Sequence, residues 1–347
     1  MTQKLKKGYY FTDIHFGKKS NSPIHNQDCI DYINWFCEQI KNDPEADYIA
    51  FLGDWHESRN AIDIATLMFS YKGAKIINDL GLPVYFIIGN HDMGSRHSRE
   101  IYSTIPFHEF NNFKLIHEQP YVADEILGGA LFVPFLIPEE YESLHDYKHI
   151  GMWAGHFEFQ GFVLTGYSIR LEHGPSISPF KDVNNILSGH FHKRQQIGNT
   201  TYIGNTFPMD FGDNKDNDRG LAIYDHKNHN VSFINWDQCP RYIKCTLSQI
   251  VDNNIEITEK SNIHVDIDMK VTYQQLTSIE ESIKKQFKPR SLHLDESSKF
   301  IIDNEVTEHN GTQFESVSTD DLIIQILKQT DVPQIDTNLL VDLYRNA

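Results

Sequence analysis

Hydrophobic runs of strand length alternate with helix-like segments through the first third of the chain. The segments between the runs repeat apolar residues at the spacing of an amphipathic helix. In chain order, these stretches are residues 8–17, 28–42, 47–57, 64–81 and 83–92. The run from Val84 to Ile88 shows no alternation of apolar and polar residues, which is typical of a strand buried on both faces. This β-α-β-α-β order predicts a layered α/β core.

After this region the helix-like segments become rare and short apolar runs follow one another. These runs are residues 129–136, 149–158, 184–192, 200–207 and 220–236. We interpret them as a second sheet that packs on the first, with helices on the outside. The whole of residues 1–240 is therefore predicted to form a four-layer sandwich of two mixed sheets flanked by helices.

The pattern changes near residue 241, which predicts three further segments. Residues 241–294 contain two strand-like runs and a helix-like stretch at 272–287, enough for a small α+β capping domain that could bind DNA. Residues 295–318 are acidic and lack periodicity, so they are expected to form a linker. Residues 319–347 regain apolar spacing as two short amphipathic helices separated by Pro333.

Composition places the chain among globular proteins without a membrane span. Hydrophobic residues make up 39% of its 347 residues, which is compatible with a substantial core. No apolar run approaches the roughly 18 residues of a transmembrane helix, and the basic start leads directly into a strand-like run instead of a signal core. The four cysteines form no C-x-x-C pair, which favours reduced thiols. We expect a soluble, cytoplasmic protein.

The charge of the chain is unevenly distributed. A formal net charge of −17 argues against a polyanionic partner, because nucleic-acid binding normally requires a basic surface. Residues 295–347, however, hold eleven Asp or Glu against three Lys or Arg, a net of −8, which leaves −9 for residues 1–294. Part of that remainder lies in carboxylates that could hold cations. The net charge therefore does not exclude DNA as a substrate.

Residue types that bind metals stand at the ends of the predicted strands. They are Asp13 and His15, Asp54, Asn90 with His91 and Asp92, His156, and His190 with His192. A single histidine is more often a surface or core residue than a ligand, but the recurrence at five strand ends favours a common site. Residues two apart on a strand point to the same side, so the pairs Asp13/His15 and His190/His192 could each aim two donors at one point.

This donor set favours a pair of divalent cations. Oxygen and imidazole ligands without thiolates suit Mn, Fe, Zn or Co, and a carboxylate such as Asp54 can bridge two ions. Two cations roughly 3.5 to 4 Å apart form a clamp for phosphoryl chemistry. The sequence therefore predicts two-metal hydrolysis of a phosphate ester.

The order D-x-H, G-D, G-N-H-D, G-H and G-H-x-H resembles the signature of the calcineurin-like metallophosphoesterases. These blocks read "TDIH", "LGDWHE", "IGNHD", "AGHFE" and "SGHFH" in this chain. Their spacing, the segment after "GHFH", the cap and the tail resemble the SbcD-type DNA repair nucleases across essentially the whole chain. The resemblance implies a DNA exonuclease or endonuclease, two Mn²⁺ ions (with Mg²⁺ or others as alternatives), a homodimer, and an SMC-like ATPase bound by residues 319–347.

The resemblance also implies a role for each residue of the blocks. Asp13, His15 and His192 would bind the first metal, and Asn90, His156 and His190 the second, with Asp54 bridging both. His91 would protonate the leaving oxygen, a role that suits an imidazole because its ordinary pKa lies near working pH, and Asp92 would orient it.

The chain departs from the family pattern near the bridging aspartate. Cellular members often carry a histidine three residues after it that positions substrate, whereas this chain has Glu57 there and His56 beside it. His56 and Glu57 are candidate substrate contacts, with a capping or solvated His56 equally favoured. His25 could contact DNA, although an ordinary structural role is favoured.

Two other functions use the same residues. One is a phosphomonoesterase or cyclic-nucleotide phosphodiesterase, although such enzymes usually lack the cap and the acidic tail. The other is a non-catalytic scaffold, although such members generally lose metal ligands or the histidine of "GNHD", and this chain retains them all.

Overall fold

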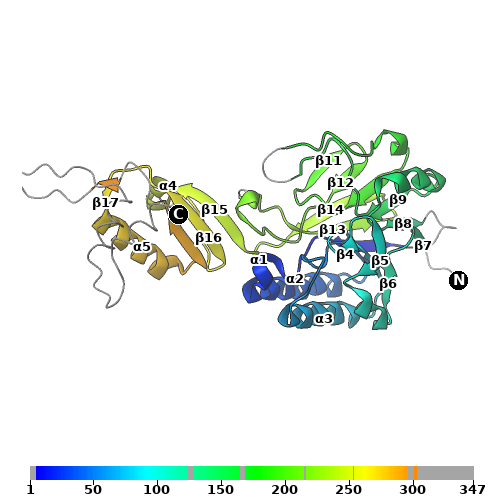
Figure 1. Ribbon diagram of the computed structural model, residues 1–347, viewed down its shortest axis with the longest axis horizontal. Coiled ribbons are helices and arrows are strands. Elements are labelled where there is room, and N and C mark those ends of the chain that lie inside the picture. The colour runs from blue at the N-terminus through cyan, green and yellow to red at the C-terminus, as the bar shows by residue number, and fades with distance from the viewer. Residues whose placement is uncertain are drawn as a thin grey trace, which may run out of the picture.

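Two six-stranded mixed sheets form the larger part of the molecule (Figure 1). The computed structural model describes residues 5–123, 129–164, 169–214, 216–252, 254–295 and 301–302. The first sheet has the order β14-β13-β1-β2-β3-β6. Its strands are β1 (Lys7–Phe11), β2 (Ala46–Phe51), β3 (Val84–Ile87), β6 (Phe113–Ile116), β13 (Gly220–Asp225) and β14 (Asn230–Asn235). Strands β1, β2, β3 and β6 run parallel, and β13 joins β1 antiparallel.

The second sheet has the order β11-β12-β10-β9-β8-β7. Its strands are β7 (Tyr121–Ala123), β8 (Ala130–Val133), β9 (Met152–Gly155), β10 (Asn185–Ser188), β11 (Gln195–Ile197) and β12 (Thr200–Tyr202). The central strands β8, β9, β10 and β12 are parallel, and the two edge strands are antiparallel. A small hairpin of β4 (Met93–Ser95) and β5 (Ser98–Tyr102) follows β3.

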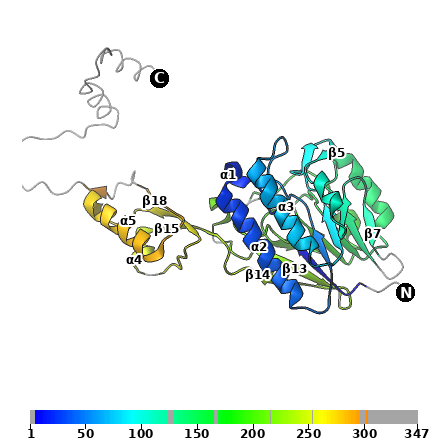
Figure 2. The same ribbon diagram turned by 90° about the horizontal axis from the view of Figure 1, so that it is seen from below.

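Two helices cover the outer face of the first sheet and lie side by side (Figure 2). They are α2 (Pro23–Lys41) and α3 (Ile64–Asn78). Proline at the first turn of α2 suits its unpaired N–H position, and Asp63 caps α3 by accepting from the backbone N–H of Ala65 at 2.8 Å. Buried residues of both helices pack against Phe11, Phe51 and other outward-facing residues of the sheet.

Alternation along the strands produces the layers. Phe51 points to the helices, whereas Ala50 packs in the apolar layer between the two sheets. A third apolar layer covers the far face of the second sheet, where Trp153 packs against Phe180. This outer layer contains 3₁₀ helices over Pro138–Tyr147 and Ser178–Phe180. The predicted α/β sandwich of two mixed sheets is therefore confirmed, with its fourth layer built from 3₁₀ segments. Two further 3₁₀ helices span Ile105–Glu109 and Phe211–Asp213.

A smaller α+β unit follows at one side of the sandwich (Figure 1). It comprises the parallel strands β15 (Arg241–Thr246), β16 (Ser261–Asp266) and β18 (Ser291–Leu294), helices α4 (Leu247–Val251) and α5 (Tyr273–Phe287), and the short pair β17 (Val271–Thr272) and β19 (Ile301–Ile302). Helix α5 confirms the helix expected at 272–287, and Thr272 begins it with a capping box. Two salt bridges tie this unit to α2, from Arg290 to Asp28 at 2.6 Å and from Lys260 to Asp31 at 3.0 Å.

Most of the predictions for residues 295–347 concern residues that the structure does not describe. Apart from residues 295 and 301–302, the acidic linker expected at 295–318 and the helices expected at 319–347 lie outside the described residues. Within the ranges that are described, no helix combines the length and the hydropathy needed to cross a membrane.

Candidate metal centre

Strands from both sheets bring the predicted ligands to one edge of the sandwich. In the first sheet, β1 leads to Asp13 and His15, β2 to Asp54, and β3 to Asn90. In the second sheet, β9 leads to His156, and β10 leads to His190 and His192. Because these strands are parallel within their sheets, their carboxyl ends share one edge, where loops of open α/β sheets form binding sites.

The backbone at these strand ends is left-handed instead of extended. The φ angles are 50° at Asp13, 51° at His15, 61° at Asp54 and 83° at His190, values that non-glycine residues rarely adopt. We predicted that Asp13 and His15 converge because side chains two residues apart on an extended strand point to the same side. The two side chains do converge, but that reason is wrong. The two side chains converge because the chain leaves β1 through two left-handed residues. Backbone hydrogen bonds from Asp13 to Gly53 and from His15 to Asp54 hold this turn against the loop after β2.

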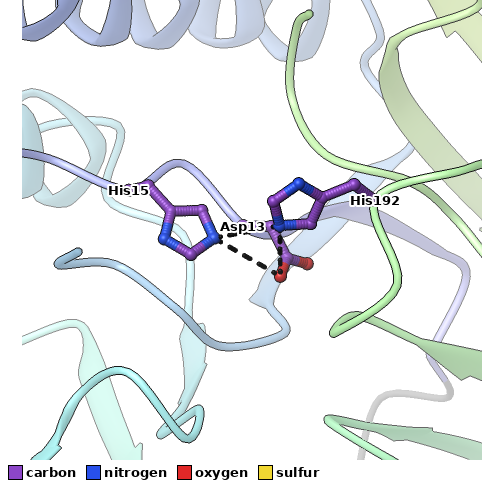
Figure 3. Close-up of side chains that lie close together, drawn as sticks. All are labelled: Asp13, His15 and His192. Atoms are coloured by element: carbon purple, nitrogen blue, oxygen red, sulfur yellow. Dashed lines mark hydrogen bonds and ion pairs between the residues drawn. The ribbon is translucent and has the colours of Figure 1, made fainter. Parts of the chain in front are cut away.

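Asp13, His15 and His192 form a first cluster of donors (Figure 3). The Nε2 atoms of His15 and His192 lie 3.2 Å apart, and each lies 3.8 Å from Oδ1 of Asp13. That oxygen is buried and has no hydrogen-bond partner among the described residues. The other oxygen, Oδ2, accepts from the hydroxyl of Thr12 and the N–H of His190. Since an unpaired buried oxygen is costly, this arrangement fits a cation held by Oδ1 and the two imidazoles.

Asp54, His156, His190 and Asn90 form a second cluster beside the first. Asp54, His156 and His190 can hold a cation, and Oδ1 of Asn90 lies 3.0 Å from Nε2 of His156 and 2.9 Å from Nδ1 of His190. Oδ2 of Asp54 lies 3.3 Å from Nε2 of His156 and 3.9 Å from Nε2 of His15. Asp54 thus stands between the two clusters, as a bridging ligand would.

Hydrogen bonds behind the imidazoles orient them toward the clusters. Nδ1 of His156 donates to the carbonyl of Leu52 at 2.6 Å, which turns Nε2 toward Asp54. Behind His190, Nε2 lies 3.5 Å from Oε1 of Glu158. We did not select Glu158 from the sequence, although its place two residues after His156 in "GHFE" was a usable signal.

The carboxylates of the site favour positive charge at two buried histidines. Burial alone would lower the pKa of His15, but Asp13 and Glu57 outweigh it and raise that pKa to about 10. Burial is likewise outweighed at His156, where Asp54 raises the pKa to about 9. At His192 burial prevails and lowers the pKa to about 3. The carboxylates that raise these two pKa values are also the groups with which a divalent cation would pair.

His91 and Asp92 lie at the site in different ways. The N–H of His91 donates to Oδ1 of Asp54, and its Nδ1 donates to the carbonyl of Glu57 at 2.8 Å. The carboxylate of Asp92 instead accepts four backbone N–H groups, from Asp54, Trp55, His56 and Gly89. The expectation that Asp92 orients His91 is therefore corrected. The carbonyl of Glu57 accepts from the imidazole, and Asp92 ties the loop after β2 to the loop after β3 through these four N–H groups.

The side chains of His56 and His25 are both buried. His56 is buried, with its ring nitrogens 2.7 Å from the hydroxyls of Ser70 and Ser103. His25 is also buried, and its Nε2 donates to the carbonyl of His15 at 2.9 Å. The candidate substrate contact of His56 is corrected to a structural role. The hydrogen bond of His25 fits the ordinary structural role that the sequence favoured, and its side chain also lines a pocket beside Lys19 and Arg290. Glu57 is part-buried and lies against His15, with Oε2 at 2.7 Å from Nδ1.

Comparisons with known proteins agree with this geometry. Residues 9–194 match the calcineurin-like phosphoesterase family. The chain is 24% identical over 286 residues to exonuclease subunit 1 of Enterobacteria phage T4, which covers 79% of each chain and supports the predicted relationship to SbcD-type nucleases.

Solved structures of two phosphoesterases also match. An archaeal phosphodiesterase is 11% identical, with a TM-score of 0.35, and the match covers 66% of this chain and 99% of that one. The nuclease MPE of Pseudomonas putida is 17% identical, with a TM-score of 0.29, and the match covers 56% and 66%. Likeness of this degree carries no conclusion about activity. The family match, by contrast, spans more than half of the chain and contains both donor clusters, so the protein belongs to the calcineurin-like phosphoesterase family of metal-dependent hydrolases.

Proposed function

We propose that this chain is the nuclease subunit of a complex with an SMC-like ATPase, and that it cleaves DNA with two divalent metal ions during double-strand break processing and recombination. The observation that carries the proposal is the pair of donor clusters that meet at Asp54. A relative described as an exonuclease subunit supports both the nuclease activity and the presence of a partner subunit.

Each of the two clusters would bind one metal ion. Asp13, His15 and His192 would hold the first ion, Asn90, His156 and His190 the second, and Asp54 both. Bound ions of the Mn²⁺ class supply an activated water and neutralise charge on the phosphate. Mn²⁺ is our first choice because oxygen and imidazole donors suit it, and Mg²⁺ is the alternative.

His91 would supply the proton to the leaving oxygen of the cleaved phosphodiester. Its Nδ1 is engaged by the carbonyl of Glu57, so Nε2 is the nitrogen available for proton transfer. The backbone N–H of His91 donates to Asp54, which fixes the imidazole relative to the bridging carboxylate. A proton donor anchored in this way is pre-positioned for reaction.

Basic residues near the clusters offer contacts for DNA phosphates in an otherwise acidic protein. Lys18 lies 3.6 Å from Glu57. Burial lowers the pKa of Arg59 and the charge of Asp54 opposes that shift, and the pKa of Glu158 is lowered by His190 with a smaller contribution from Arg96. The charges of these basic residues would favour the approach of a polyanion to the metal centre despite the net charge of −17.

The test is metal-dependent digestion of DNA. The Mn²⁺-loaded protein should degrade linear DNA or open hairpins, and its activity should rise when the partner ATPase is added. Closed circular DNA separates exonuclease from endonuclease cleavage. Faster hydrolysis of an aryl phosphomonoester or a cyclic nucleotide than of any DNA would favour the alternative enzyme, and no hydrolysis with both ions bound would favour a non-catalytic scaffold.

A homodimer through α3 is part of the proposal. The side chains of Ile64, Leu67, Met68 and Tyr71 are 77%, 40%, 70% and 43% exposed, and their i, i+3, i+4, i+7 spacing places them on one stripe of the helix. A second copy could cover this stripe with its own. Light scattering should give twice the monomer mass, and Met68→Glu should halve it. A monomeric wild-type protein would remove the dimer from the proposal.

A further inference from the structure

Glu57 turns its side chain toward the first cluster instead of toward solvent. Oε2 of Glu57 and Nδ1 of His15 lie 2.7 Å apart. Both atoms are buried and neither makes a hydrogen bond among the described residues, so the ion pair between them is the polar contact that they share. The other oxygen, Oε1, lies 3.6 Å from Nζ of Lys18. The two oxygens of one carboxylate thus serve two partners, an imidazole inside and a lysine nearer the surface.

This contact determines which nitrogen of His15 can bind a cation. Nε2 faces Asp13 and His192, whereas Nδ1 faces Glu57. An imidazole that binds a metal through Nε2 keeps its proton on Nδ1, and a carboxylate is a strong acceptor for that proton. The matching position behind His156 is a neutral carbonyl, that of Leu52. His15 therefore has the more strongly polarising support of the two.

The backbone of Glu57 makes a second pair of contacts. Its carbonyl accepts from Nδ1 of His91, and its N–H donates to the carbonyl of Phe16 at 3.0 Å. A β-bridge between Phe16 and His56 adds to this connection. The loop after β1 and the loop after β2 are thereby joined at Glu57, which fixes the carboxylate relative to His15.

We propose that Glu57 is a positioning residue that holds His15 for the first metal ion through its carboxylate and holds His91 through its carbonyl. The inference rests on the proposed two-metal function and assigns a role at a position where the family resemblance suggested a substrate contact. Glu57 acts through His15, so its loss weakens one metal site and spares the other.

The experiment is a titration of the metal-free protein with Mn²⁺, in which binding is monitored by calorimetry and by electron paramagnetic resonance. Glu57→Ala should lower the affinity of one of the two sites by roughly 10- to 100-fold, the scale for losing the partner of a ligating histidine. The Mn²⁺ affinity of Glu57→Gln should lie between that of Glu57→Ala and that of the wild type, because the amide oxygen still accepts the Nδ1 proton. The resonance of that proton of His15 should persist in Glu57→Gln and exchange with solvent in Glu57→Ala.

A double-mutant cycle identifies the site that is weakened. Because Glu57 acts through His15, adding Glu57→Ala to His15→Ala should cause no further loss of Mn²⁺ affinity. Glu158→Ala is the matched control, since Glu158 lies against His190 of the other cluster and its effect should add to that of His15→Ala.

Three results would overturn the inference. They are wild-type affinity at both sites in Glu57→Ala and Glu57→Gln, an equal loss at both sites, or additivity with His15→Ala. If Glu57→Ala does not fold, Glu57→Gln still decides between them. A wild-type protein that binds one ion defeats the two-metal function itself, which is a different outcome from two ions bound without help from Glu57.

Discussion

Replacing Asp92 tests whether its carboxylate serves the fold or the chemistry. Its two oxygens accept four backbone N–H groups, those of Trp55 and His56 at Oδ1 and those of Asp54 and Gly89 at Oδ2, at 2.9 to 3.0 Å. The carboxylate is buried, so Asp92→Ala leaves these donors without acceptors. At about 1 to 3 kcal/mol for each unsatisfied donor, four of them exceed the loss typical of a point mutation.

We expect Asp92→Ala to lower the free energy of unfolding by about 4 kcal/mol, the low end of the sum over four donors, because an entering water can satisfy some of them. Asp92→Asn should lose about half as much or more, because its NH₂ group faces two N–H donors. Urea unfolding should be measured in chelator, so that bound metal does not add stability. Asp79→Ala is the control, since that exposed carboxylate pairs with Lys75 on the surface and should change stability by less than about 0.5 kcal/mol.

The opposite result would restore the role predicted from the sequence. Suppose that the urea midpoint of Asp92→Asn equals that of the wild type and that the variant binds both ions but no longer cleaves DNA. Asp92 then acts through His91. The four N–H contacts would in that case be replaceable, and the reasoning from unsatisfied donors would be refuted.

Four further predictions concern the metals, the acid and the tail. His91→Ala should keep both ions and its affinity for DNA but lower cleavage by roughly 10²-fold, and a loss of metal would make His91 a ligand instead. His190→Ala should leave one ion by elemental analysis, whereas two retained ions would contradict its assignment. Because the pKa values of His15 and His156 are raised to about 10 and 9, Mn²⁺ must displace protons at pH 7 and its affinity should rise with pH. Calorimetry in buffers of different ionisation enthalpy should detect these protons, and no release would contradict the prediction. Truncation before Ser318 should preserve metals and basal cleavage while abolishing co-purification with the ATPase, and a lower melting temperature with lost metal would show that the tail packs on the catalytic domain.

The strands and the donor clusters could be predicted because their signals are local in the sequence. Each ligand follows an apolar run, and the runs that end in Asp13, Asp54 and Asn90 form neighbouring parallel strands. Parallel neighbours end at the same edge, so the strand order alone brings their ligands together. The glycines before Asp54 and Asn90 add to the signal, because a Cβ at Gly89 would lie 2.2 Å from Oδ1 of Asp54.

The roles of His56 and Glu57 could not be predicted because their surroundings come from distant parts of the chain. His56 is buried against Ser70 of α3 and Ser103 beyond β5, neither of which is marked by the sequence around residue 56. Glu57 turns inward because its backbone is held to Phe16 across two loops. A polar residue beside a metal-binding motif has the same local pattern whether it faces a substrate, a ligand or the core.

The left-handed backbone at the strand ends costs free energy, and the buried carboxylates around the clusters offset that cost. A non-glycine residue in this conformation costs about 1 to 3 kcal/mol, and four of the ligands adopt it. Hydrogen bonds from backbone N–H groups offset that cost, since Asp92 accepts four of them and Oδ2 of Asp13 accepts the N–H of His190. The oxygens that hold the strand ends, those of Asp92 and Oδ2 of Asp13, are therefore not the oxygens that would bind a metal ion. Metal removal should accordingly leave the loops in place, and the free energy of metal binding is then available for affinity instead of for folding the site.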